Sequence, residues 1–166
     1  MKCPRCPSGL LKQEKYEEVQ IDRCSTCLGV WLDEGELLHI IQKKEVQFTS
    51  NQIVETLNKT ATVIPEFEYK TKEFCPKCSI QMTPMNFQYG SGVVIDRCPS
   101  KHGVWLDQNE LEKAQIFFET NEIKKDSESK KWNELSNNAK NKSFSETKGI
   151  DGGILFKLIY KIINQS

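Results

Sequence analysis

Seven cysteines, the residues of this chain best suited to binding a metal ion, occur in closely spaced groups. Cys3 and Cys6 form a Cys-x2-Cys pair, and after seventeen residues Cys24 and Cys27 form another. Each such pair curls into a knuckle whose two thiolates point toward one centre, so two knuckles supply four sulfurs in a tetrahedron. Zn²⁺ is the usual ion of such closed four-sulfur sites. The spacing predicts one zinc ion bound by Cys3, Cys6, Cys24 and Cys27.

A second group begins in the same way but lacks its last sulfur. Cys75 and Cys78 form a pair, and Cys98 follows after nineteen residues. The position that matches Cys27 holds Lys101, which cannot be a ligand, but His102 is the next residue. Because an imidazole reaches further from the backbone than a thiolate, His102 can serve from the neighbouring position. The sequence therefore predicts a second zinc ion, with the ligands Cys75, Cys78, Cys98 and His102.

Alternatives remain open for both groups. If His102 is only a surface histidine, the second site keeps an open position for water, as catalytic zinc sites do. Four cysteines also suit a rubredoxin-like iron site. A redox Cys-x-x-Cys pair needs a βαβ context, whereas both pairs here lead into strand-like sequence. His39, the other histidine, is expected to face solvent and is given no role.

A repeated phrase shows which elements position these groups. "DRCSTCLGVWLDEGEL" at 22–37 returns as "DRCPSKHGVWLDQNEL" at 96–111, with ten of sixteen positions identical. Each copy follows the same order of cysteine pair, β-hairpin, second ligand pair and helix. The hairpin tips are expected at 16–18 and 90–92, where the second has the turn sequence Gly-Ser-Gly. The fold class is thus a small, metal-stabilised α+β protein with two tandem zinc ribbons.

Acidic and aromatic residues recur beside the ligands. Asp33 with Glu36, and Asp107 with Glu110, have the spacing of a helix capping box, in which the aspartate accepts backbone N–H groups and the glutamate reaches back. Capping explains these acids more simply than catalysis does. The large aromatic side chains that follow the last ligands are expected to cover the knuckles and fix the next helix; they are Trp31 and Trp105.

Changes in composition divide the chain into five segments. Ribbons with their helices are expected at 1–46 and 72–122, joined by a linker at 47–71. The segment 123–149 is rich in Lys, Glu, Ser and Asn, a composition typical of disorder. The final segment, 150–166, is predicted to be an amphipathic helix.

The motifs resemble those of the transcription-factor-IIB-type zinc ribbon family, whose function is mostly undefined. The family phrase is roughly C-P-x-C, a hairpin, and then I-D-x-C-x-x-C-G-G-V-W-L-D-x-G-E-L. Cys3–Cys6 with 21–37 matches it closely, and Cys75–Cys78 with 95–111 nearly as well. Leu28 departs from a glycine of the phrase, and Lys101-His102 replaces cysteine-glycine. The resemblance implies the ribbon fold and zinc, and says little about activity.

Composition and charge limit the function. Lysine and arginine balance aspartate and glutamate, 23 against 23, so no overall basic field favours nucleic acid. Phosphate binding needs clustered basic residues, which neither ribbon has. No apolar run approaches the roughly 20 residues of a membrane-spanning helix, and no secretory signal precedes Cys3. These features favour the reducing cytoplasm, where such cysteines bind metal more often than they form disulfides.

The predicted function is that of a non-catalytic protein, an interaction scaffold in which two structural Zn²⁺ ions replace part of a core. A transcription-associated or nucleic-acid-binding factor is the alternative, and a zinc enzyme at an open second site ranks below it. The C-terminal helix is expected to attach the chain to its own apolar surface, to a protein partner or second copy, or through 154–163 to a membrane surface.

Overall fold

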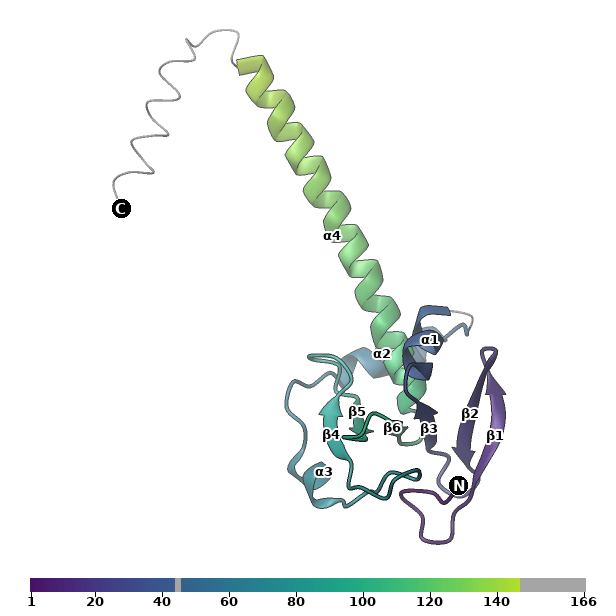
Figure 1. Cartoon of the computed structure of the whole chain (residues 1–166). Helices are drawn as coiled ribbons and strands as arrows, with labels where there is room; N and C mark the ends of the chain where they lie inside the picture. Colours follow the sequence, from purple (N-terminus) through teal and green to yellow (C-terminus); the bar gives the residue numbers. More distant parts are fainter. Residues whose placement is uncertain (44–45, 147–166) are drawn as a thin grey trace. The chain divides into compact units, whose positions relative to one another are not determined.

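Both halves of the repeat contribute strands to one antiparallel sheet (Figure 1). The computed structural model describes residues 1–43 and 46–146, and within them it places six strands. Their order across the sheet is β1-β2-β3-β6-β5-β4, so the second half reverses the order of the first. The strands are β1 Leu11–Tyr16, β2 Val19–Cys24, β3 Val30–Asp33, β4 Thr83–Asn86, β5 Val94–Arg97 and β6 Gly103–Leu106.

The two predicted hairpins are confirmed. Strands β1 and β2 pair from Leu11↔Cys24 to Tyr16↔Val19, and the two residues between them, Glu17 and Glu18, have positive φ angles of 44° and 64°. Two consecutive positive φ angles are the signature of a tight type I′ turn. Strands β4 and β5 are joined by a longer loop in which Gly90 and Gly92 have positive φ.

The ribbons meet at their third strands, β3 and β6. Trp31 lies opposite Trp105 in this antiparallel pair, and Val30 lies opposite Leu106. The sequence predicts two separate modules, but the structure joins them in one compact unit, Met1–Asn121. The physical reason is that each short apolar strand would otherwise be the edge of a three-stranded sheet, with unpaired backbone N–H and C=O groups.

The two faces of the sheet carry different cores. Because side chains alternate along a strand, Val30 and Leu32 of β3 face one way and Trp31 faces the other. The first face packs against the helices through a fully aliphatic cluster from both ribbons; its buried members are Ile21, Val30, Leu32, Ile40, Val93, Ile95, Val104, Leu106, Leu111 and Ala114. The second face carries both tryptophans together with the cysteines; its buried members are Cys3, Leu11, Cys24, Trp31, Cys75, Met82, Cys98 and Trp105.

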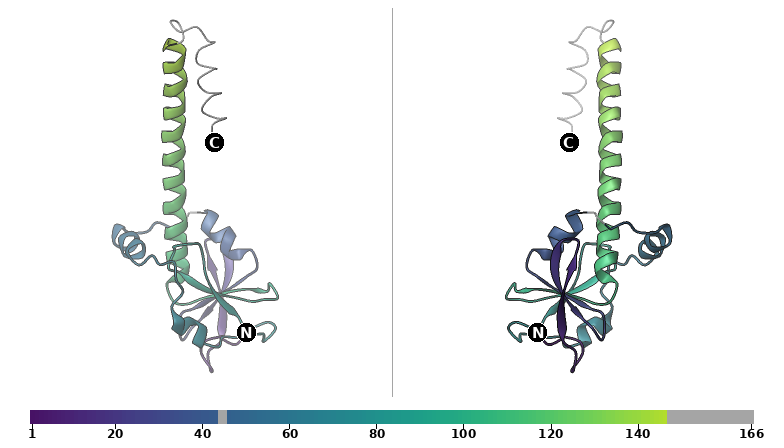
Figure 2. Two further views of the ribbon diagram at one scale, coloured as in Figure 1. Left: turned by 90° about the vertical axis from the view of Figure 1, so that its left-hand side faces the viewer. Right: turned by 90° about the vertical axis from the view of Figure 1, so that its right-hand side faces the viewer.

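Three short helices precede the longest one. Helices α1 (Glu36–Lys43) and α2 (Ser50–Asn58) lie at one end of the sheet with the first turns of α4, and α3 (Glu66–Lys70) lies toward the other end (Figures 1 and 2). The linker predicted at 47–71 thus contains two helices. The start of α2 was readable in the sequence, because Thr49 and Gln52 form a reciprocal capping box.

Helix α4 runs Glu110–Glu146, and from Glu122 on it belongs to the second unit of the chain. The disorder predicted for 123–149 is not found up to Glu146. The first turns of α4 are anchored by buried side chains such as Leu111 and Phe117. Once a helix is nucleated, each further residue adds a hydrogen bond. This growth continues through Lys and Glu, which favour helix, and through Ser and Asn, which do not. From 123 to 138 every side chain is exposed, and the predicted helix at 150–166 lies outside the described residues.

Within residues 1–43 and 46–146, no helix combines the length and the apolar character that crossing a membrane requires.

Each central tryptophan rests on a glycine of the other ribbon. A Cβ atom on Gly29 would lie 2.2 Å from Cζ2 of Trp105, and one on Gly103 would lie 2.8 Å from Cζ2 of Trp31. Real Cβ atoms do not approach other atoms this closely, so both positions need glycine for space. Both indole rings are fully buried. Because each ring packs on a glycine of the other ribbon, these two contacts stabilise the association of the ribbons.

Gly29→Ala is expected to destabilise the whole unit Met1–Asn121 by about 1–3 kcal/mol, because the added methyl group overpacks the site of Trp105. Denaturant unfolding of the zinc-loaded protein measures the change. The double variant Gly29→Ala with Trp105→Phe removes the part of the ring that the methyl group meets. It should lose less stability than the sum of its two single variants; strict additivity would contradict the ring contact.

Candidate metal centres

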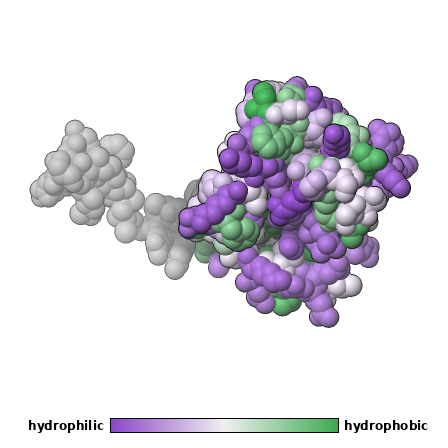
Figure 3. All heavy atoms as spheres, turned by 90° about the horizontal axis from the view of Figure 1, so that it is seen from below, coloured by the Kyte–Doolittle hydropathy of each residue, from purple (hydrophilic) through white to green (hydrophobic). Residues whose placement is uncertain are grey.

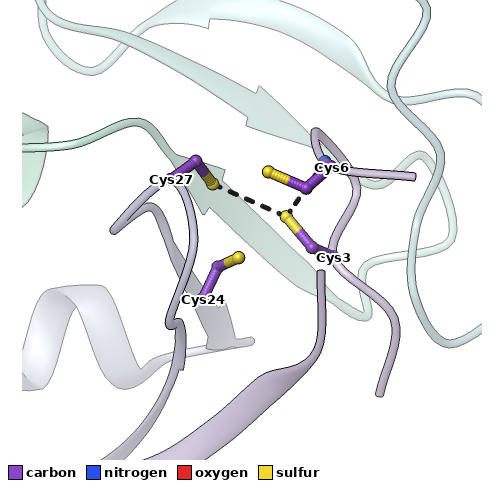
Figure 4. A group of neighbouring side chains, drawn as sticks. All are labelled: Cys3, Cys6, Cys24 and Cys27. Atoms are coloured by element: carbon purple, nitrogen blue, oxygen red, sulfur yellow. Dashed lines mark hydrogen bonds between the residues drawn. The ribbon is translucent and has the colours of Figure 1, made fainter. Parts of the chain in front are cut away.

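The first group of four cysteines comes together at the base of the first ribbon (Figure 4). Cys3 and Cys6 lie in the turn before β1, Cys24 ends β2, and Cys27 lies in the turn before β3. All four sulfur atoms lie within 4.8 Å of one another, and Sγ of Cys3 is 3.6 Å from Sγ of Cys27. In Figure 4 the four side chains converge on a common centre.

These distances can be compared with those that zinc requires. With Zn–S bonds of about 2.3 Å, the sulfurs of a regular tetrahedron lie about 3.8 Å apart. The separation of 3.6 Å between Cys3 and Cys27 is close to this value. It is much longer than the sulfur–sulfur bond of about 2.05 Å in a disulfide, and all seven cysteines are free. The first group fits a tetrahedral zinc ion.

The second group has the same shape with one nitrogen. Sγ of Cys78 lies 3.6 Å from Sγ of Cys98, and Nδ1 of His102 lies 3.6 Å from Sγ of Cys98 and 3.8 Å from Sγ of Cys75. A tetrahedral zinc ion with one nitrogen ligand would place nitrogen and sulfur about 3.5 Å apart. All four ligand atoms lie within 4.8 Å of one another. The structure thus brings His102 to the fourth position, where the sequence predicts it.

The way in which His102 reaches this position differs from the prediction. It faces the sulfurs with Nδ1, the ring nitrogen nearer the backbone, so long reach is not the explanation. The turn changes instead: in the first ribbon the N–H of Leu28 donates to the carbonyl of Cys24, and Leu28 has a φ of 61°. In the second ribbon the corresponding bond comes one residue earlier, from Lys101 to Cys98, and Lys101 has a φ of 58°. The tighter turn places the next residue at the metal position.

Backbone N–H groups lie around the sulfurs of Cys3 and Cys24, the two buried cysteines of the first site. Those of Arg5 and Cys6 donate to Sγ of Cys3 at 3.4 and 3.3 Å, and that of Thr26 donates to Sγ of Cys24 at 3.4 Å. Hydrogen bonds of this kind favour a negatively charged sulfur. The knuckles therefore stabilise the thiolate form that a metal ion binds.

The thiols of each group differ in their pKa. Burial raises the pKa of both Cys27 and Cys75 to about 11. Burial also raises the pKa of Cys24 and Cys98, but hydrogen bonds from backbone N–H groups and from neighbouring cysteines outweigh it, so both pKa values fall to about 7. Each group thus contains a thiol whose pKa is lowered and at least one whose pKa is raised. Because metal binding displaces the protons of its ligands, binding should weaken as the pH falls.

Both groups are closed by protein. Cys3, Cys24, Cys75 and Cys98 are at most 7% exposed, and the other members of each group are half-buried. Four protein ligands complete the coordination of a tetrahedral ion and leave no position for a water molecule. A zinc ion held in this way supplies folding energy. The geometry supports this reading of the second site over an open one.

Comparison with protein families agrees with the geometry. The model of the TFIIB-type zinc ribbon, described as a transcription factor zinc-finger, matches residues 2–43 and 74–115, which together are just over half of the chain. The chain belongs to this family. Two zinc ribbons with one site each correspond to two zinc ions per chain. Comparison with curated proteins and with solved structures gives no match.

A second layer around the sites was missed in the sequence. The residue between the paired cysteines of each ribbon is basic and reaches the other ribbon: Arg5 pairs with Glu73 and Asp107, and Lys77 pairs with Asp33 at 2.7 Å. The signal was present, since both pairs read Cys-Pro-basic-Cys. It could not be interpreted without knowing that the ribbons touch.

The two aspartates of the capping boxes are thereby given another role. As predicted, Glu36 and Glu110 each accept the backbone N–H three residues earlier, at 2.7 Å. The side chains of Asp33 and Asp107, however, accept from the indole N–H of Trp31 and Trp105, at 2.8 and 3.1 Å. Each aspartate thus links the tryptophan of its own ribbon to the cation of the other. His39 is exposed, as expected.

The assignment of His102 can be tested by zinc content. Purified wild-type protein is expected to hold two zinc ions per chain, and His102→Ala fewer than two. The matched control, Lys101→Cys with His102→Leu, copies the Cys27-Leu28 pair of the first ribbon and should restore two. Elemental analysis measures the ratio. Two tightly held ions in His102→Ala would show that His102 is not a ligand.

The half-buried Glu110 should make stability depend on pH. Burial raises its pKa from the ordinary 4.5 to about 7, although the N–H of Asp107 partly opposes this. Its ionised form is therefore unfavourable in the folded protein, and stability is lost as the pH rises from about 4.5 to 7. Glu110→Gln keeps an acceptor but cannot ionise. Its stability relative to wild type should grow by about 2 kcal/mol between pH 5.5 and 8 and then level off.

Denaturant unfolding of the zinc-loaded proteins at each pH measures this difference. Glu36→Gln is the matched control, because Glu36 caps the corresponding helix and burial raises its pKa less. Its curve should be flatter. A pH-independent difference between Glu110→Gln and wild type would contradict the assignment.

Proposed function

We propose that this zinc-binding protein is a non-catalytic scaffold of the cytoplasm, whose joined ribbons bind a protein partner. One zinc ion is held by Cys3, Cys6, Cys24 and Cys27, and the other by Cys75, Cys78, Cys98 and His102. With four protein ligands at each ion, the metal maintains the shape of the unit and takes no part in chemistry. Function then depends on the surface that the ribbons present.

An apolar groove on this surface carries the proposal. It lies within the first compact unit, between helix α1 and the hairpin of β4 and β5, and has a volume of about 340 Å³. Its apolar lining includes Leu37, Leu38, Ile41, Met85, Phe87 and Phe118. Two of these side chains reach far into solvent, since Leu38 is 54% exposed and Met85 is 38% exposed. Exposed apolar residues gathered in a groove are typical of a binding site.

The other ribbon shows that folding does not require these apolar residues. Because the second ribbon repeats the first 74 residues later, Leu38 corresponds to Glu112. In the hairpins, Met85 lies opposite Ile95 as Glu14 lies opposite Ile21, so Met85 corresponds to Glu14. Glu14 forms an ion pair with Arg23 at 2.5 Å. Thus each of these apolar positions has a glutamate as its counterpart in the opposite ribbon.

The chemistry of the groove indicates the kind of partner. Its floor is aliphatic and aromatic, and the charged residues at its edge are already paired: Arg97 with Glu34 at 3.2 Å, and Asp33 with Lys77. A protein segment that inserts one or two apolar side chains fits this lining. On the face drawn in Figure 3, by contrast, hydrophobic residues form small separate groups among hydrophilic ones.

The charges give less support to the nucleic-acid alternative. Phosphate binding needs basic side chains that are free to contact phosphates. Within the described residues, Arg5, Arg23, Lys77 and Arg97 of the two ribbons each pair with a carboxylate. The family name describes a shared ribbon, and a shared fold does not establish a shared function.

Leu38→Glu with Met85→Glu is expected to abolish partner binding and leave the fold intact, because glutamate occupies the position equivalent to each of them in the repeat: Glu112 for Leu38, and Glu14 for Met85. Zinc-loaded wild-type protein would first select binders from a random peptide library displayed on phage. Selected peptides should carry aromatic or aliphatic side chains, bind with micromolar affinity, and bind the double variant at least tenfold more weakly.

The control is Val54→Glu, which lies on helix α2 outside the groove and is 57% exposed, close to Leu38. It should bind the peptides as wild type does, and zinc content should be equal in all three proteins. The proposal is wrong if no peptide is enriched, or if the selected peptides bind all three proteins equally. Tight, salt-dependent binding of a random DNA or RNA oligonucleotide would favour the alternative.

A further inference from the structure

The two metal sites lie on either side of one shared pair of strands. In the first ribbon, β3 begins three residues after Cys27; in the second, β6 begins directly after His102. The metal ligands therefore hold the start of each central strand. Since β3 and β6 pair over four residues, from Val30↔Leu106 to Asp33↔Gly103, a disordered knuckle on one side removes the pairing partner of the other side.

The tryptophan rings that pack on the glycines beside the ligands also make each ribbon depend on the other. Gly29 lies two residues after Cys27 and receives the ring of Trp105; Gly103 lies next to His102 and receives the ring of Trp31. Each ring thus belongs to one ribbon and packs beside the ligands of the other. Both rings belong to one buried cluster with the buried cysteines of both sites, which are Cys3, Cys24, Cys75 and Cys98.

The basic residues between the ligand cysteines add a polar contact in each direction. Arg5, between Cys3 and Cys6, pairs with Glu73 and Asp107 of the second ribbon. Glu73 is only 4% exposed, and a carboxylate buried to this degree requires a partner. Lys77, in the corresponding position between Cys75 and Cys78, pairs with Asp33 of the first ribbon. A knuckle that loses its metal would also lose this cation from its place.

Neither ribbon has a core of its own that could make up for these losses. Both buried clusters draw on both ribbons, and a module of about 45 residues buries too little apolar surface to fold without metal. In such modules the free energy of metal binding is also the free energy of folding. When one metal ion has ordered β3 and β6, binding of the other ion no longer has to supply the free energy of ordering these strands.

We infer that the two zinc sites are loaded and emptied as one cooperative unit, in which an ion at either site strengthens binding at the other. Coupling between two sites is reciprocal, so each site should raise the affinity of the other by the same factor. The contacts above lead us to expect a factor of at least tenfold. For sites of similar intrinsic affinity, the half-loaded protein is then a minor species at every zinc concentration.

Native mass spectrometry can count the zinc ions on each chain. The fully loaded, full-length protein is titrated with a zinc chelator, and the fractions with two, one and no ions are recorded. If the two sites bind zinc independently, whether or not their affinities are equal, at least half of the chains carry one ion when half of all sites are filled. Tenfold coupling of equal sites lowers this fraction to about a quarter. A one-ion fraction below half supports the inference. For sites of equal intrinsic affinity a fraction of half or more overturns it, and the ligand variant below decides the case of unequal sites.

Two variants complete the test: one lacks a metal ligand, and the other lacks the ion pairs between the ribbons. Cys24→Ser removes one ligand of the first site and should lower the zinc affinity of the intact second site at least tenfold. Arg5→Gln with Lys77→Gln keeps all eight ligands and should raise the one-ion fraction above that of wild type. An unchanged second site in Cys24→Ser would also overturn the inference.

The inference rests on the assignment of the eight ligands, and the two can fail separately. Wild-type protein that holds no zinc would contradict the assignment. Two ions that leave independently would contradict only the coupling. The second result has no bearing on the groove, whose test uses fully loaded protein.

Discussion

The structure depends above all on the antiparallel pairing of β3 with β6. Each strand has only four residues, yet their pairing turns two three-stranded sheets into one sheet of six. It brings Trp31 opposite Trp105 and sets each indole ring on a glycine of the other ribbon. It also brings the Cys-Pro-basic-Cys knuckle of each ribbon within reach of acids on the other. Without this pairing, the residues around the ligands would lose their burial, and the ion pairs between the ribbons would not form. The glycines beside the ligands would then have no ring of the other ribbon to accommodate.

The metal sites could be predicted from the sequence because their information is local. Ligand spacing within a ribbon is set by hairpin length and knuckle geometry, and both are properties of consecutive residues. The detail that failed, the route by which His102 reaches the metal, depends on where a turn places its residue of positive φ. That residue is Leu28 in one ribbon and Lys101 in the other. Neither residue type favours such a conformation, so the shift of one position left no mark in the sequence.

The pairing of the ribbons could not be predicted, because no local pattern describes it. "GVWLD" in both copies reads as a short apolar strand, and a strand does not reveal its neighbour. Two consequences followed. From the sequence alone, Asp33 and Asp107 are predicted to be helix caps, because the tryptophan and the opposite cation that they bind are not evident from local sequence. The composition of 123–149 predicts disorder, whereas up to Glu146 this segment continues a helix whose first turns are packed. In each case a contact distant in sequence overrode a correct local tendency.

The unequal halves of the repeat separate what the fold requires from what it permits. Positions that serve the shared core are alike in both ribbons, such as Ile21 and Ile95, Trp31 and Trp105, and Asp33 and Asp107. Positions at the outer surface differ in character: Glu14 and Glu112 of one side correspond to Met85 and Leu38 of the other. Because the fold carries glutamate at the equivalent places, the apolar pair gives the fold no benefit that glutamate fails to give. Exposed apolar groups carry a cost in solubility, and that cost is explained if the groove is covered when the protein acts.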